Sequence, residues 1–199
     1  MESASDRRTQ IQTAAMRVFA RKGYRNTVVE DVAEEAGVSK GTIYTYFDRK
    51  EELLGSVFQG LMEELRGQEE EILESDRTPL EKIRAMLHEF VDVIGDREEG
   101  FARVMLDIWI ASLRNPKQFG IDFAGLYAGY RSLIRDLLRE AQARGDVPAD
   151  LSHVAPTVLI GAIEGVLLQW LLDPENVDFP EAADDIIDLL YQGIRAKPS

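Results

Sequence analysis

Cysteine is absent from the 199 residues, and histidine occurs only twice. Without cysteine the chain has no disulfide, no thiolate metal site and no cysteine nucleophile, which fits a reducing compartment. The N-terminal segment MESASDRRTQ lacks the apolar stretch of a secretory signal. The longest apolar run, 158–172, is interrupted by Glu164 and Gln169 and is shorter than the roughly 18 residues that a membrane helix needs. We therefore expect a cytoplasmic protein with no membrane partner.

Signs of catalysis are also scarce. His88-Glu89 begins like a zinc-binding helix, but Asp92 occupies the position of the second histidine and no third ligand is indicated. His153 has no visible catalytic partner, and segment 37–42 resembles a phosphate loop without its Lys-Ser/Thr ending. The sequence predicts no catalytic residue, no metal, no cofactor and no enzyme activity.

Sustained strand alternation is missing, whereas apolar residues recur at helical spacing along the whole chain. The pattern predicts an all-α protein of about nine helices. Asp48, with Glu51 three residues later, is expected to cap a helix, and Thr78-Pro79-Leu80-Glu81 to start another. A long helix is expected to carry Phe119 along one side and to end at Gly145.

The acidic excess is uneven. The formal net charge is -13, but residues 1–50 hold nine Lys/Arg against seven Asp/Glu, which gives +2. The other 149 residues hold 14 against 29, which gives -15. We therefore predict two domains, 1–50 and 51–199, and assign the acidity to the second.

Two short helices joined by a glycine turn are predicted in the segment TVVEDVAEEAGVSKGTIYTYFDRK, residues 27–50. Thr27 is expected to cap the first helix with Glu30 reaching back to it. Gly37 stands where a left-handed turn must end that helix, and Ser39 offers an oxygen to cap the next. The pattern indicates a helix-turn-helix.

The second of these helices carries few core residues. Only Ile43 and Phe47 are clearly buried types at i, i+4 spacing. The remaining side chains suit a surface that lies in the major groove of DNA, where donors, hydroxyls and methyl groups read base edges. They are Lys40, Gly41, Thr42, Tyr44, Thr45 and Tyr46. The alternative is a solubilising surface helix with Tyr44 in the core.

This segment and the helix before it resemble the N-terminal DNA-binding domain of the TetR family of bacterial transcriptional regulators. The resemblance covers roughly residues 8–60 and rests on Ile11, Ala14, Ala15, Val18, Phe19, Gly23-Tyr24, Thr27, Asp31-Val32-Ala33, Ala36-Gly37-Val38-Ser39, Gly41-Thr42-Ile43-Tyr44, Tyr46-Phe47 and Lys50-Glu51-Glu52-Leu53-Leu54. It implies that Lys40, Gly41, Thr42, Tyr44 and Thr45 lie near base edges. It also implies that Thr27, Tyr46 and Lys50 contact phosphates.

The resemblance further implies a homodimer on a near-palindromic operator, with the partner contacts in the acidic domain. Gly161 and Gly165 have a spacing that permits close helix approach. Ile186, Ile187, Leu190 and Ile194 form a second apolar face. The alternative is that these residues complete the core of one subunit.

Aromatic and a few polar residues of the later helices are expected to converge on an effector cavity, as the resemblance implies. The predicted effector residues are Phe90, Met105, Asp107, Trp109, Phe123, Tyr127, Tyr130, Glu164 and Trp170. Their chemistry favours a hydrophobic or amphipathic effector, such as a fatty acyl compound or a drug-like molecule. Ordinary core packing is the alternative. An unpaired Glu164 would be costly, so it either pairs across the dimer, faces a wet pocket or lies at an exposed edge.

The predicted function is a ligand-responsive repressor that leaves its operator when the effector binds. A helical lipophile carrier with a degenerate helix-turn-helix is the alternative from another class. The salt dependence of DNA binding separates the two, because a carrier has no sequence preference and no steep slope.

Overall fold

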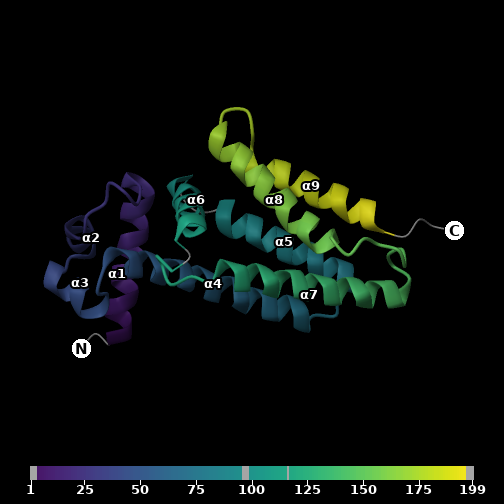
Figure 1. Cartoon of the computed structure of the whole chain (residues 1–199), viewed down its shortest axis with the longest axis horizontal. Coiled ribbons are helices and arrows are strands. Elements are labelled where there is room, and N and C mark those ends of the chain that lie inside the picture. Colours follow the sequence, from purple (N-terminus) through teal and green to yellow (C-terminus); the bar gives the residue numbers. More distant parts are fainter. Residues whose placement is uncertain (1–3, 96–98, 116, 196–199) are drawn as a thin grey trace. The chain divides into compact units, whose positions relative to one another are not determined.

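The computed structural model describes residues 4–95, 99–115 and 117–195. Within these ranges the chain forms nine α-helices and no strand (Figure 1), which confirms the predicted all-α class. The helices are α1 (Ala4–Lys22), α2 (Val29–Ala36), α3 (Lys40–Tyr46), α4 (Lys50–Glu74), α5 (Pro79–Gly95), α6 (Glu99–Arg114), α7 (Phe123–Arg144), α8 (Ala155–Leu172) and α9 (Phe179–Ile194).

The chain divides into two compact units. The first unit comprises the described residues of 1–64 and 97–123, and the second those of 65–96 and 124–199. Helix α4 therefore contributes its N-terminal part to one unit and its C-terminal part to the other. The domain boundary at residue 50 stays a prediction.

The core of the first unit forms between α1, α2, α3, the start of α4 and α6. Its fully buried large side chains are Ile11, Val18, Phe19, Ile43, Phe47, Leu53, Leu54, Phe101 and Ile108. Two glycines allow backbones to meet there. A Cβ on Gly55 would lie 2.1 Å from the carbonyl oxygen of Phe119, and one on Gly100 would lie 1.9 Å from that of Ala20. Any larger residue at either position would force these segments apart.

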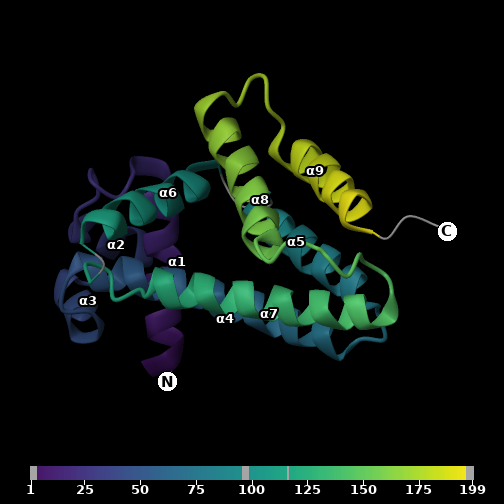
Figure 2. The ribbon, with the colours of Figure 1, turned by 45° about the vertical axis from the view of Figure 1, so that its right-hand side comes forward.

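The second unit packs α5, α7, α8 and α9 around one apolar cluster. The cluster consists of Leu80, Ile83, Ile134, Leu137, Leu138, Ala141, Val147, Ala155 and Leu159. Helix α9 packs against both α5 and α8, and Figure 2 shows it alongside α8. Across these helices, Arg84 pairs with Asp188 at 2.6 Å and His88 with Asp184 at 2.8 Å.

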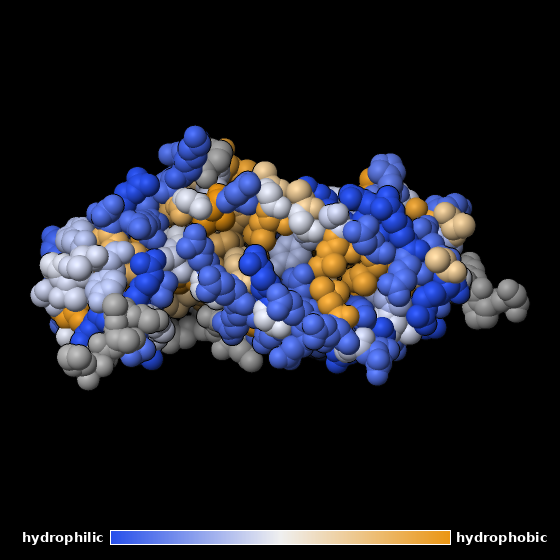
Figure 3. Space-filling model, turned by 90° about the horizontal axis from the view of Figure 1, so that it is seen from below, coloured by the Kyte–Doolittle hydropathy of each residue, from blue (hydrophilic) through white to orange (hydrophobic). Residues whose placement is uncertain are grey.

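Helix α8 is apolar on two sides. One side is buried in the second unit, and the other exposes large apolar side chains. The exposed ones are Val158 (51%), Leu168 (43%) and Leu172 (75%), and the N-cap residue Val154 (46%) precedes them. By length and composition alone this helix could cross a membrane. On the face in Figure 3, hydrophilic side chains surround several apolar areas.

Some predicted helix ends are confirmed and others are wrong. Thr78 caps α5: its backbone N–H donates to Glu81 at 2.8 Å, and its hydroxyl accepts from the Glu81 N–H at 3.4 Å. Phe119 is not in α7 but lies buried in the turn before it. Asp48 bonds through its N–H to Glu52 at 2.8 Å instead of pairing with Glu51, because α4 begins only at Lys50.

Candidate nucleic-acid interface

The turn between α2 and α3 has the predicted local chemistry. Gly37 ends α2 with φ +64°, a left-handed conformation that a Cβ would penalise. The N–H of Val38 donates to the carbonyl of Ala33 at 3.0 Å, and that of Gly37 to Glu34 at 3.1 Å. Ser39 then caps α3, since its hydroxyl accepts from the Thr42 N–H at 3.0 Å. These contacts set the direction in which α3 leaves α2.

Helix α3 has one apolar face and one polar face. Ile43 and the residue after the helix, Phe47, are each 1% exposed and anchor α3 to the core. Tyr44 is 44% exposed and is therefore not in the core. Lys40, Gly41 and Thr45 are exposed, whereas Thr42 and Tyr46 are half-buried. The outer face thus presents hydroxyls, an ammonium group and a phenol.

A glutamate of α2 holds the ammonium group of Lys40. The distance from Lys40 Nζ to Glu30 Oε1 is 2.5 Å, and both side chains are about half exposed, at 49% and 57%. The same ammonium lies 5.7 Å from the centroid of the Tyr44 ring. The hydrogen bond from Lys40 lowers the pKa of Glu30 and raises that of Lys40. The first residue of α3 is therefore oriented by neighbours on two helices.

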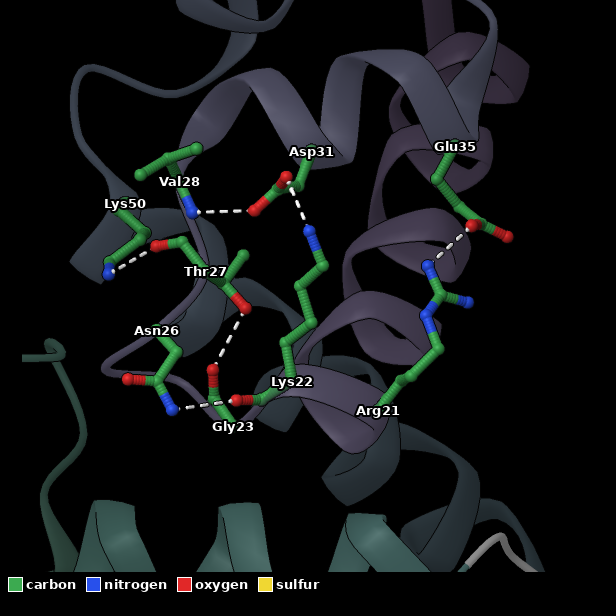
Figure 4. A network of polar contacts seen from close by, with 9 residues as sticks. All are labelled: Arg21, Lys22, Gly23, Asn26, Thr27, Val28, Asp31, Glu35 and Lys50. Atoms are coloured by element: carbon green, nitrogen blue, oxygen red, sulfur yellow. Dashed lines mark hydrogen bonds and ion pairs between the residues drawn. The ribbon is translucent and has the colours of Figure 1, made fainter.

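Thr27 lies in a polar network before α2 (Figure 4). It was expected to cap α2, but Val28 is the capping residue, and its N–H donates to Asp31 at 3.0 Å. The Thr27 side chain is 1% exposed, and its hydroxyl donates to the carbonyl of Gly23 at 2.8 Å. This carbonyl follows the end of α1, so the hydroxyl joins α1 to the start of α2 instead of capping.

Lys50 belongs to the same network. Its Nζ donates to the carbonyls of Tyr24 at 2.9 Å and Thr27 at 2.8 Å, and it lies 4.3 Å from the centroid of the Tyr24 ring. The ammonium thereby ties the start of α4 to the turn before α2. The predicted phosphate contacts of Thr27 and Lys50 stay predictions.

Tyr24 joins three segments of the first unit. Its hydroxyl donates to Glu51 at 2.7 Å, and its ring contacts those of Phe19 and Phe119, with centroids at 5.8 and 5.6 Å. Burial, together with Glu51, raises the pKa of the Tyr24 phenol. The sequence did not predict this junction, because Glu51 and Phe119 are far from Tyr24 in the chain.

Two further ion pairs join α1 to α2. Arg21 bonds to Glu35 at 3.0 Å and Lys22 to Asp31 at 2.6 Å. Together with Glu30, three carboxylates of this eight-residue helix neutralise cations of the same unit. The acidic side of α2 is therefore matched to basic residues on two neighbouring helices.

The predicted effector residues fall in both units. In the second unit, the Tyr127 hydroxyl donates to the carboxylate of Glu164, and both side chains are half-buried. Burial raises the pKa of Glu164, although the hydrogen bond opposes this. Burial also raises the pKa values of Tyr127 and Tyr130. Glu164 thus has a hydrogen-bond partner within its own subunit.

The other predicted effector residues are apolar or half-buried. Trp170 stacks on Phe179 with centroids 5.6 Å apart, and Phe90 is half-buried. In the first unit, Met105 is 6% exposed, Asp107 and Trp109 are half-buried, and the Phe123 ring lies 5.2 Å from that of Phe58. The effector roles of all nine residues stay predictions.

A groove of about 430 Å³ runs between α1, α4 and α6 in the first unit. It is lined by Thr9, Gln12, Thr13, Met16, Arg17, Ala20, Ser56, Val57, Gly60, Leu61, Glu64 and Phe101. None of these residues was predicted as an effector contact. A groove between helices does not follow from the helical pattern of any one of them.

The residues predicted at the dimer interface divide into two groups. Gly161 and Gly165 have no atom within 4 Å of an added Cβ, so the described chain leaves open space on that side of each glycine. Ile187 is 1% exposed, and Leu190 and Ile194 pack against the core cluster of the second unit. Ile186 is half-buried, while Leu189, which the sequence analysis did not single out, is 64% exposed.

Comparisons with known proteins agree with this architecture. Residues 11–57 match "Bacterial regulatory proteins, tetR family", and residues 79–192 match "BetI-type transcriptional repressor, C-terminal". The fatty acid metabolism regulator protein of Bacillus subtilis (strain 168) is 25% identical, over 94% of this chain and 95% of that protein. The transcriptional regulator TtgR of Pseudomonas putida is 28% identical, over 100% of this chain and 96% of that protein.

A solved structure has the same fold over nearly its whole length. The transcriptional regulator FadR from Bacillus subtilis in complex with stearoyl-CoA superposes with a TM-score of 0.77 and is 26% identical. The match covers 94% of this chain and 98% of that one. The chain therefore belongs to the TetR family of bacterial regulatory proteins and is a ligand-responsive, DNA-binding transcriptional repressor.

Proposed function

We propose that this repressor binds a near-palindromic operator as a homodimer through the outer face of α3, and that a hydrophobic or amphipathic effector releases it. The observation that carries the proposal is the polar face of α3, where Lys40, Tyr44 and Thr45 are exposed on a helix anchored by Ile43. A solubilising helix gains little from an exposed phenol, whereas a groove-reading helix uses donors and methyl groups there.

Within this proposal the eight predicted DNA-binding residues divide by role. Lys40, Gly41, Thr42, Tyr44 and Thr45 read base edges, and Tyr46 contacts a phosphate. Thr27 and Lys50 position the interface, because the Thr27 hydroxyl is buried and bonded to Gly23 and the Lys50 ammonium is bonded to two backbone carbonyls. Any phosphate contact at Thr27 therefore comes from its surroundings and not from its hydroxyl.

Dimerisation uses the outer side of α8 and the adjoining side of α9. Val158, Gly161, Gly165, Leu168 and Leu172 recur at spacings of three and four residues and share one side of α8. The two open glycines let a second helix approach closely, and the exposed apolar side chains beside them gain from burial. On α9, Leu189 and Ile186 continue this surface, whereas Ile187 serves the core of its own subunit.

The effector binds in the C-terminal domain, near Tyr127, Tyr130 and Glu164. Half-buried polar groups among aromatic and aliphatic side chains suit a ligand with an apolar body and a few hydrogen-bonding atoms. The relatives are consistent with this class, since one is a fatty acid metabolism regulator protein and the similar structure of the regulator FadR is a complex with stearoyl-CoA.

Release requires the effector to distinguish two arrangements of the dimer. To shift a population from 1:99 to 99:1, the effector must favour the released arrangement by about 5.5 kcal/mol. Helix α4 contributes residues to both units and is the natural connection. Family membership disfavours the carrier alternative, and we propose a cytoplasmic protein without enzyme activity.

The test is a gel shift on DNA from the region upstream of the protein's own coding sequence. We expect wild type to retard this DNA and Lys40→Ala with Tyr44→Ala to lose at least tenfold in affinity, because each good base contact contributes about 1–3 kcal/mol. Arg139→Ala, which removes an exposed charge from α7, is the control and should bind like wild type. Unchanged binding by the double variant would contradict the proposal.

A further inference from the structure

We infer that Glu30 is a positioning residue that sets the specificity of DNA binding, by holding Lys40 for a base contact and withholding it from phosphates. The inference rests on the proposed function, because it assigns a role within the same α3 surface. No part of the predicted DNA-binding set included Glu30.

The geometry places Glu30 at the proposed interface. Lys40 is the first residue of α3 and Glu30 lies in the first turn of α2, yet their charged atoms are 2.5 Å apart. A base or phosphate that Lys40 reaches is therefore also close to the Glu30 carboxylate. With 57% of its side chain exposed, Glu30 is not shielded from such a phosphate.

Lys40 has bonding capacity left in this arrangement. A lysine ammonium group carries three N–H donors, and Glu30 occupies one of them. The ring of Tyr44 also lies near the ammonium, with its centroid 5.7 Å from Lys40 Nζ. Lys40 can thus keep Glu30 and donate a further hydrogen bond to an acceptor such as guanine O6 or N7. Glu30 and Tyr44 together restrict the direction of that donor.

Non-specific binding draws on the same ammonium differently. Non-specific binding depends on neutralising phosphates. Each neutralised phosphate makes the slope of log affinity against log salt more negative by about 0.9. While Glu30 neutralises Lys40, this cation contributes little to phosphate binding. Residues 1–50 have a formal charge of only +2, so the loss of one cation per recognition helix is a large share. Specific binding is affected less, because the base contact survives.

Glu30→Gln tests the inference, since it keeps the shape of the side chain and removes the charge. Fluorescence anisotropy is measured across a salt series on a duplex from the protein's own upstream region and on a shuffled duplex of the same composition. We expect affinity for the shuffled duplex to rise on the order of threefold to tenfold, with a slope steeper by about 0.9 per recognition helix. Affinity for the upstream duplex should stay constant or fall.

Two controls separate this role from a general effect of charge. Glu35→Gln removes the same charge from α2 but frees Arg21 of α1, so it should change the specificity ratio less than Glu30→Gln. In Glu30→Gln with Lys40→Met, the gain on shuffled DNA should disappear. A gain that persists without Lys40, or an equal gain in Glu35→Gln, would overturn the inference.

The outcomes for wild type distinguish this inference from the proposed function. If wild type prefers the upstream duplex and Glu30→Gln has the same slope and specificity ratio, the inference fails and the proposed function stands. If wild type binds neither duplex at low salt, both fail.

Discussion

The left-handed turn at Gly37 should make the helix-turn-helix sensitive to a single added methyl group. Gly37 has φ +64°, and no atom lies within 4 Å of the position that a Cβ would take. Replacement by alanine therefore causes no collision with a neighbour. The whole cost of Gly37→Ala comes from the backbone conformation, which the structure fixes through the bonds of Val38 and Gly37 to α2.

Because the backbone conformation is the only cost, the size of the destabilisation by Gly37→Ala can be estimated. A non-glycine residue in the left-handed region costs about 1–2 kcal/mol. For a chain of this length, each kcal/mol lowers the melting temperature by about 2–4 °C. We expect Gly37→Ala to lower the melting temperature by about 2–8 °C and to weaken operator binding, because α3 is held at the altered turn.

Gly60→Ala is the matched control in the same unit. Gly60 lies within α4 and has equally open space at its Cβ, but its φ is not positive. In a helix, alanine is favoured over glycine by about 0.5–1 kcal/mol, so this variant should melt slightly higher than wild type. Calorimetry or thermal circular dichroism measures both. Equal shifts of the same sign for the two variants would refute the reasoning.

Three further predictions concern the cap of α3, the carboxyl group of Glu164 and the exposed side of α8. Ser39→Ala removes the oxygen that accepts from the Thr42 N–H and should lower the free energy of unfolding, measured by chemical denaturation, by about 1 kcal/mol. Ser132→Ala on the exposed side of α7 is the control and should change it little. Burial raises the pKa of Glu164, so this group keeps a proton in the folded protein that the unfolded chain releases, and its contribution to the free energy of unfolding should fall as pH rises through that window. Glu164→Gln should lack this contribution, so the difference in free energy of unfolding between the two proteins should change with pH, and identical pH profiles would count against the burial argument. Gly161→Leu with Gly165→Leu should weaken the dimer, as measured by sedimentation, whereas Gly129→Leu on the exposed side of α7 should not. If the double variant remained fully dimeric, this side of α8 would be excluded as the interface.

The sequence was sufficient for features that depend on neighbours in the chain. Gly37 and Ser39 have their predicted roles, because a helix end and its cap involve residues within a few positions. Helical periodicity likewise predicted the all-α class and about nine helices, which agrees with the nine in the described ranges. Where a residue had two possible partners, local pattern was not enough. Thr27 bonds to Gly23 instead of capping α2, and Glu51 bonds to Tyr24 instead of capping α4.

Periodicity also cannot say which molecule covers an apolar face. Helix α9 has apolar residues on more than one side, and Ile187 is buried in its own subunit whereas Leu189 is exposed. Both fit a helical pattern equally well. The contact of Tyr127 with Glu164 joins residues 37 positions apart and depends on how α7 packs on α8. The effector site, which depends on many such contacts, is the part that the sequence predicts least well.

The most direct test of the central claim, that α3 reads DNA, is to identify the residues that touch the bases. Wild type is bound to its upstream duplex with 5-iododeoxyuridine in place of thymine, irradiated and digested with trypsin. Cleavage after Lys40 and Arg49 isolates one peptide that contains Tyr44 and Tyr46. We expect this peptide to carry the main cross-link. Cross-links confined to residues 124–199 would contradict it.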